Sequence, residues 1–170
     1  MQPHERITGL EALHGVPLHV ALVEPEIPPN TGNVSRLCAA TGCALHLVEP
    51  LGFRIDDREL KRAGLDYWHN VALVMHPSLE AFLDATASLN RWYFSTRATR
   101  RYDEAAFAPG DVLVFGKETK GLPRELIERH RDRALRIPMR EDGVRSINLS
   151  TAAGIATYAA LAKIGFPGLR

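Results

Sequence analysis

Two short apolar segments in the second half of the chain each run directly into a loop of small and polar residues. The first is Val112–Phe115, followed by a loop in which Gly116 and Gly121 bracket Glu118. The second is Leu135–Ile137, followed by a longer polar loop. Both segments have the length and residue types of buried strands. Two such strand ends side by side would form a crevice at the carboxyl edge of a sheet, which is where open α/β proteins bind ligands.

Each loop carries residue types that suit the binding of a small ligand. Glycine at 116 and 121 lets the backbone approach a ligand closely, because no Cβ stands in the way. A tight strand-to-helix turn explains the same pair of glycines equally well. In the second loop, Ile137 at a proline-kinked strand end can supply the apolar slot that an adenine ring needs. Ser146 and Asn148 also suit helix capping, since short polar side chains satisfy the free amides of a helix start.

A third candidate for chemistry is Arg36, in an early stretch that is rich in small and polar residues. The apolar segment Leu18–Val23 predicts the first strand, and a stiff, extended, proline-rich loop should follow it. We predict a helix capped by Thr31 or Asn33, in which apolar residues 34, 37 and 38 follow helical spacing. Arg36 lies off that stripe, near a helix start whose exposed amides favour an anion. An arginine there can fix a phosphate or stabilise an alkoxide, although a plain surface arginine is the simpler interpretation.

Strands and helices alternate along the rest of the chain. Further strands are predicted at Ala44–Val48, Val71–Met75 and Trp92–Ser95. Helices are predicted over 57–63, 78–87 and 148–161, with another opened by Pro123, and the first helix should end at Gly42. This alternation predicts an α/β fold, a mostly parallel sheet with helices on both faces. The 170 residues suit one domain, and no repeat or low-complexity linker divides them.

Composition is that of an ordinary globular protein and does not by itself indicate a partner. Hydrophobic residues make up 45%, charged residues 24%, and the net charge is +1, so a nucleic-acid partner would need a local basic patch. Basic clusters occur at 97–101, 129–133 and 61–62, although interspersed acids favour a solvated face for each. Neither the two cysteines nor the seven histidines have the spacing of a metal site or a disulfide framework. No segment is apolar enough for a signal peptide or a membrane span, so we expect a soluble, cytoplasmic protein without a metal.

Three stretches together resemble the SPOUT-class RNA methyltransferases, and most closely the tRNA wobble-nucleotide ribose 2′-O-methyltransferases. They read EPEIPPNTGNVSRLCAATG, VLVFGKETKGLP and LRIPMREDGVRSINLS, and the resemblance extends from Leu18 to Gly168. It implies one domain over 18–170 behind an extension of residues 1–17, with a trefoil knot in the C-terminal half. Lys117 stands where that family usually has proline, so it changes the stiffness of the loop or adds a contact to RNA.

The resemblance also implies a cofactor and an assembly. S-adenosylmethionine would be held by groups around Ser95, Gly116, Ile137, Ser146 and Asn148. The first and last helices would form a homodimer in which both subunits contribute to the catalytic site. The small-residue pattern of the last helix is explained at least as well by burial against the sheet of its own subunit.

The implied substrate is the ribose of the wobble nucleotide, position 34, in the tRNA anticodon loop, either a cytidine or a modified uridine. Arg36 would be the catalytic residue, and Asn33 and Arg145 would contact RNA. Glu118 would either order its loop or act on the positive side of the cofactor. Two alternatives stay open: the same chemistry on ribosomal RNA or another tRNA position, and a non-catalytic RNA-binding dimer.

Overall fold

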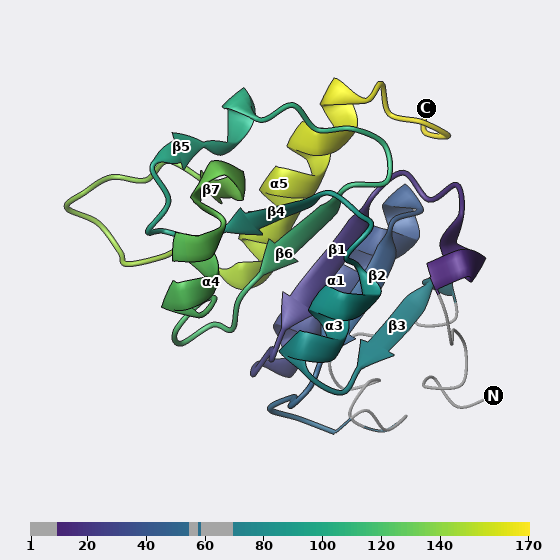
Figure 1. Cartoon of the computed structure of the whole chain (residues 1–170), viewed down its shortest axis with the longest axis horizontal. Coiled ribbons are helices and arrows are strands. Elements are labelled where there is room, and N and C mark those ends of the chain that lie inside the picture. Colours follow the sequence, from purple (N-terminus) through teal and green to yellow (C-terminus); the bar gives the residue numbers. More distant parts are fainter. Residues whose placement is uncertain (1–9, 55–57, 59–69) are drawn as a thin grey trace.

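The computed structural model describes residues 10–54, 58 and 70–170 of the chain (Figure 1). Its strands, in chain order, are β1 (His19–Val23), β2 (Ala44–Val48), β3 (Leu73–His76), β4 (Arg91–Phe94), β5 (Arg100–Arg101), β6 (Val112–Phe115) and β7 (Ala134–Arg136). The α-helices are α1 (Pro28–Thr41), α3 (Leu79–Ala85), α4 (Arg124–Arg129) and α5 (Leu149–Lys163). Short 3₁₀ turns lie at η2 (Leu10–Leu13), η4 (Tyr102–Glu104) and η5 (Arg131–Arg133). Apart from residue 58, the helix predicted over 57–63 lies outside the described residues.

The strands of the described chain form one sheet with the order β3-β2-β1-β6-β4-β7-β5, and every neighbouring pair is parallel. The predicted parallel sheet is therefore confirmed. At its centre Leu22 of β1 lies opposite Leu47 of β2 and Phe115 of β6. The two candidate loops follow β6 and β7. We expected these two strands to lie side by side, but they are not neighbours in the sheet. Strand β4 lies between them, and its carboxyl end lies at the same edge of the sheet.

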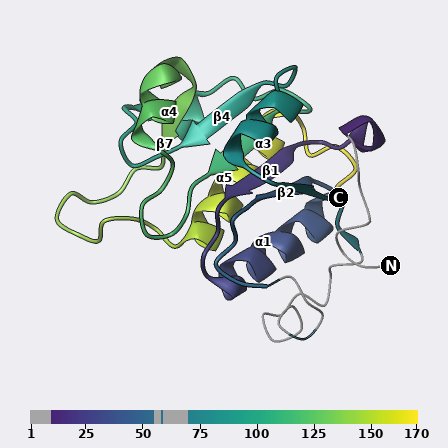
Figure 2. The ribbon, with the colours of Figure 1, turned by 60° about the horizontal axis from the view of Figure 1, so that its bottom comes forward.

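Helices cover both faces of the sheet, as the alternation predicts (Figure 2). Alternate residues of β1 show the two sides: Val20 and Leu22 pack in the core cluster that contains α1 and α5 residues, and Ala21 and Val23 in the cluster that contains α3 and α4 residues. All four side chains are buried, which is the continuous apolar pattern of a strand covered on both faces. Because the strands are parallel, the loops that follow them lie at one edge of the sheet.

The start of α1 corrects the sequence prediction. Pro28 and Pro29 do not form an extended loop but occupy the first helical positions, and Ile27 is the N-cap, with no side-chain capping bond. Proline is favoured there because its fixed φ suits the first turn and its missing N–H would have no helical partner. Thr31 therefore lies inside the helix instead of capping it. Gly42 ends α1 as predicted, with a φ of 77° and its N–H donating to the carbonyl of residue 38 over 2.9 Å.

Other predicted boundaries are nearly right. Ser78 caps α3 by accepting a hydrogen bond from the amide of Ala81 over 3.0 Å. Pro123 is the N-cap of α4 and not its first helical residue. The two-residue edge strand β5 was not predicted, because Arg100–Arg101 carries no apolar signal and pairs only at the edge of β7.

Leu13 of η2, which precedes residue 18, is buried in a cluster with Ala44 and Val74. The division into an extension of residues 1–17 and a domain over 18–170 stays a prediction. The trefoil knot also stays a prediction, since strand order and pairing do not determine how the chain threads. None of the described helices is long and apolar enough to cross a membrane.

Candidate active site

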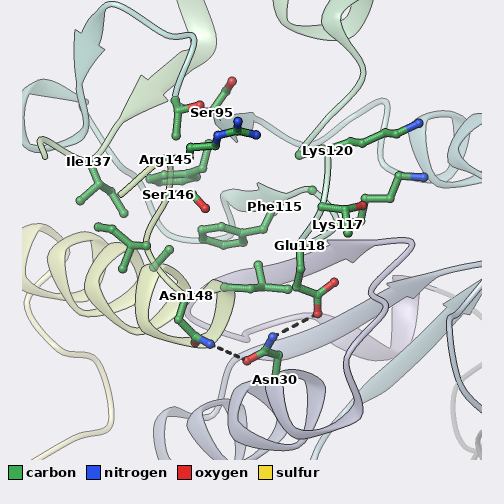
Figure 3. A pocket seen from close by; sticks show the side chains of 18 of the residues that line it. Asn30, Ser95, Phe115, Lys117, Glu118, Lys120, Ile137, Arg145, Ser146 and Asn148 are labelled. Atoms are coloured by element: carbon green, nitrogen blue, oxygen red, sulfur yellow. Dashed lines mark hydrogen bonds between the residues drawn. The ribbon is translucent and has the colours of Figure 1, made fainter. Parts of the chain in front are cut away.

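A cavity of about 400 Å³ opens at the carboxyl ends of β4, β6 and β7 (Figure 3). Its apolar floor is made by side chains that include Phe94, Phe115, Leu135, Ile137 and Leu149. The rings of Phe94 and Phe115 stack with centroids 4.8 Å apart and planes 17° from parallel. A cavity of this size, apolar with polar groups at its edges, suits a ligand of the size of a nucleoside.

Six of the eight sequence-predicted site residues line this cavity, while two do not. Those that line it are Ser95, Gly116, Ile137, Arg145, Ser146 and Asn148. Ser95 directly follows β4, and its side-chain oxygen accepts a hydrogen bond from the amide of Arg97 over 3.1 Å. Asn33 and Arg36 lie on α1 outside the cavity lining. The structure thus brings together residues from three separate strand ends and the start of α5.

The two glycines of the 116–121 loop serve the turn itself. A Cβ on Gly116 would lie 2.1 Å from both the carbonyl carbon of Gly121 and the amide nitrogen of Leu122. Gly121 has a φ of +67° and donates its N–H to the carbonyl of Lys117 over 2.8 Å. The interpretation as a tight turn therefore holds. The close approach of the Gly121 and Leu122 backbone is enough to require glycine at 116, without a ligand.

Glu118 fixes this loop to the start of α1. Its carboxylate accepts hydrogen bonds from the amides of Glu26 and Ile27, over 2.8 and 3.0 Å, and from the side-chain amide of Asn30 over 3.2 Å. Because α1 has no cap from its own sequence, a carboxylate 91 residues further along the chain satisfies donors at this helix start. Of the two roles left open for Glu118, the contacts give the ordering of the loop.

A second carboxylate completes this attachment from the other side. Glu26 accepts hydrogen bonds from the hydroxyl of Thr119 over 2.6 Å and from its amide over 3.1 Å. The hydroxyl bond, followed by the amide bond, lowers the pKa of Glu26 below its usual value. Two carboxylates therefore attach the loop to the segment that begins α1. The Glu118 carboxylate binds the amides of Glu26 and Ile27, and the Glu26 carboxylate binds Thr119.

Asn30 links three parts of the site and was missed by the sequence reasoning. Its side chain donates to Glu118 and accepts from the side-chain amide of Asn148 over 3.0 Å (Figure 3). Asn148 in turn caps α5, accepting from the amide of Thr151 over 3.2 Å. Asn30 is only 5% exposed, and a polar residue buried in a first helical turn must find such partners. The available signal was its position in the Asn30–Asn33 stretch, which the prediction used for the helix cap and as context for Arg36.

Comparison with known proteins agrees with this geometry. The profile of the SpoU rRNA Methylase family matches residues 17–158, which is most of the chain. The chain belongs to this SpoU family. A tRNA (cytidine(34)-2'-O)-methyltransferase of Saccharophagus degradans is 50% identical over 151 residues, which cover 88% of this chain and 97% of that protein.

Two solved structures show the same SpoU fold. One, from a study of the 2-OH methylation of C/U34 on tRNA, has a TM-score of 0.80 and 48% identity, covering 86% of this chain and 95% of its own. The other is an AdoMet-bound rRNA methyltransferase from Sinorhizobium meliloti, with a TM-score of 0.78 and 25% identity. It covers 92% of this chain and 61% of its own.

In this SpoU family member, Arg36 is exposed on α1, as predicted. It does not lie near the helix start, however, because α1 begins at Pro28 and Arg36 follows more than two turns later. Asn33, one turn earlier, lies on the same side of the helix and donates to the hydroxyl of Ser150 at the start of α5 over 3.5 Å. Asn30, Asn33 and Arg36 therefore form a polar stripe that leads from the edge of the cavity along α1. Arg36 ends this stripe, away from its own cavity.

The small residues of α5 are largely used within the chain. Ala153, Ala156 and Ala160 are fully buried in the core cluster that also contains α1 residues. The opposite side of the C-terminal region keeps Tyr158 and Phe166 exposed, at 46% and 41%, with ring centroids 6.4 Å apart. Burial within the subunit thus accounts for one face of α5.

No group of three or more His, Cys, Asp or Glu side chains in the described ranges is arranged to hold a metal ion.

Proposed function

We propose that this chain is an S-adenosylmethionine-dependent methyltransferase that methylates the ribose 2′-hydroxyl of the wobble nucleotide, position 34, of tRNA. The observation that carries this proposal is the cavity at the ends of β4, β6 and β7, in a chain half identical to a tRNA (cytidine(34)-2'-O)-methyltransferase over nearly its full length. We further propose that it acts in the cytoplasm, where its tRNA substrate would be available.

The residues of the cavity fit this cofactor. The apolar walls around Ile137 and Phe115 suit an adenine ring, and Ser95, Gly116 and Ser146 present backbone groups at the rim. Asn148 holds the α5 end of the cavity in place through Asn30. When bound, S-adenosylmethionine supplies an electrophilic methyl group, so the protein has to align and activate only the attacking hydroxyl.

Arg36 is the proposed catalytic residue, and Asn33 and Arg145 are proposed RNA contacts. A guanidinium stays protonated, so Arg36 would grip a phosphate and stabilise the developing alkoxide and would not remove a proton. Arg145 lies in the cavity lining, which supports a contact between its side chain and RNA bound at the cavity. Asn33 and Arg36 share the polar stripe of α1 outside that lining.

The place of Arg36 supports a homodimer with shared sites. A catalytic residue outside the cavity of its own subunit can act if the α1 surface faces the cavity of a second copy. Exposed apolar side chains on and near α1 and α5, namely Ile27, Tyr158 and Phe166, suit burial in such an interface.

The decisive experiment transfers labelled methyl groups from S-adenosylmethionine to unmodified tRNA, digests the product and locates the label. We expect label on the 2′-oxygen of nucleotide 34. Arg36→Ala should bind the cofactor normally and methylate at least ~100-fold more slowly, and Arg36→Lys should recover little of this loss. Label on ribosomal RNA or another tRNA position would favour the first alternative, and cofactor binding without transfer would favour a non-catalytic RNA-binding dimer.

A further inference from the structure

A second hollow lies beside the cofactor cavity, on the other side of the 117–121 loop. It has a volume of about 490 Å³ and shares Lys117, Thr119, Lys120 and Gly121 with the cavity lining. We call it the basic groove. Its own lining adds Glu24, Arg97, Leu122, Pro123 and Arg124. The two hollows are therefore neighbours that share one ordered loop.

Positively charged side chains predominate in the lining of the basic groove. Arg97, Lys117, Lys120 and Arg124 line it, against Glu24 as the one acidic lining residue. None of these four cations forms a salt bridge with another residue in the described part of the chain. The net charge of the whole chain is only +1, so this accumulation is local.

Other basic clusters of the protein behave differently. Arg101 pairs with Asp103 over 2.7 Å, and Arg133 pairs with Asp132 over 3.9 Å. These pairs match the prediction that interspersed acids make such clusters solvated faces. The cations of the basic groove form no such ion pair among the described residues, although Glu26 interacts electrostatically with Lys117 and Lys120. The excess of cations over acids in this lining is the property expected of a surface that binds an external polyanion.

The two lysines are also held in place from behind. Residues 118 and 119 are bound by the start of α1 through the Glu118 and Glu26 carboxylates, and Lys117 and Lys120 flank them directly. Figure 3 shows both lysine side chains extending in the same direction, away from Ile137 and Asn148. A fixed backbone under two charges lowers the entropy lost when they contact a ligand.

We propose that the basic groove binds the sugar-phosphate backbone of the RNA strand that flanks the nucleotide held at the cofactor cavity. This rests on the proposed function. The groove offers ammonium and guanidinium groups and no aromatic platform, so it would contact phosphates and would not stack or read bases. Because only the 117–121 loop separates the basic groove from the cofactor cavity, a single RNA strand can occupy both hollows.

The test uses Arg97→Gln with Arg124→Gln, because these two residues line the groove and not the cofactor cavity. We expect the Kd for unmodified tRNA to rise about ten-fold. The slope of log Kd against the logarithm of the salt concentration should fall by about 0.7 for each phosphate contact that is lost. S-adenosylmethionine affinity, measured by calorimetry, should be unchanged, which also shows that the protein is folded. The matched control is Arg101→Gln with Arg131→Gln, which removes the same charge from residues outside the groove lining.

The outcomes separate this proposal from the proposed function. Binding is measured without turnover, both to tRNA and to a short single-stranded oligoribonucleotide, so the groove is tested even if no methyl transfer occurs. An unchanged Kd and salt slope would overturn the groove assignment while leaving the methyltransferase intact. An equal loss in the control pair would also overturn it, because the effect would then follow net charge and not position.

Discussion

Three buried histidines make the stability of this protein depend on pH in a direction that the structure defines. His19 Nδ1 lies 2.9 Å from His46 Nε2, and His46 Nδ1 lies 2.9 Å from His76 Nε2. The rings come from β1, β2 and β3 and are all nearly inaccessible, with Phe82 of α3 packed edge-on against two of them. Neutral imidazoles can form this chain, because each ring then offers one donor and one acceptor.

Burial keeps these rings neutral in the fold. It lowers the pKa of His19 from 6.5 to about 4 and lowers the pKa of His76. The pKa of His46 lies well below its ordinary value because of burial first and of its two histidine neighbours second. The unfolded chain therefore binds more protons than the fold between the two pKa values. The stability contribution is complete above about pH 6.5 and is lost as the pH falls toward 4.

The pKa shift of His19 sets the magnitude of the effect. A pKa of 6.5 unfolded and about 4 folded removes about 2 kcal/mol of unfolding free energy between about pH 7.5 and pH 5. His46 and His76 act in the same direction. With a urea m-value of about 2 kcal/mol/M, the midpoint should fall by about 1 M or more. This is a large fraction of the stability of an ordinary domain.

Urea unfolding at fixed protein concentration, followed by circular dichroism at both pH values, measures this effect. His19→Gln should reduce the pH dependence, because one neutral buried imidazole no longer has to be protonated on unfolding. His14→Gln, at an exposed position, is the control and should follow the parent chain. Unfolding free energies that agree within about 0.5 kcal/mol at the two pH values would refute the buried neutral chain.

The remaining predictions concern the loop of the site, a control glycine on α5 and the assembly. Glu118→Ala should lower the unfolding free energy by about 2 kcal/mol in urea unfolding and weaken cofactor binding in calorimetry, because three donors at the start of α1 lose their acceptor; unchanged values would mean that this attachment is not needed. Gly116→Ala should cost about 3 kcal/mol by the same unfolding assay, since its Cβ meets the backbone of Gly121 and Leu122. Gly154→Ala, with no atom within 4 Å of its Cβ, should be neutral or slightly stabilising. Light scattering should give a mass near twice 18.8 kDa, and a monomer that still methylates RNA would contradict the shared site.

Local sequence was sufficient for most of the elements and for several residues of the cavity lining. The alternation of apolar segments with helical spacing predicts the parallel sheet and its two helical layers, because both periodicities are set by backbone geometry. Gly42 and Ser78 end and begin helices as expected, since capping depends on a few adjacent groups. Ser95, Gly116 and Ile137 could be placed at one ligand site because they follow strands, and parallel strands end at one edge.

Tertiary structure alone decided how these elements are ordered and fastened together. Strand β4 separates β6 from β7, and no local pattern encodes which strands become neighbours. No side chain adjacent to the start of α1 caps the helix, and Glu118, 91 residues from Ile27, accepts hydrogen bonds there instead. This partner is brought to the helix only by the tertiary fold. The link through Asn30 and the chain around His46 likewise join segments distant in sequence. The physical reason is that spacing along a chain fixes backbone conformation and side-chain direction, whereas the partner of a buried polar group depends on which segments pack together.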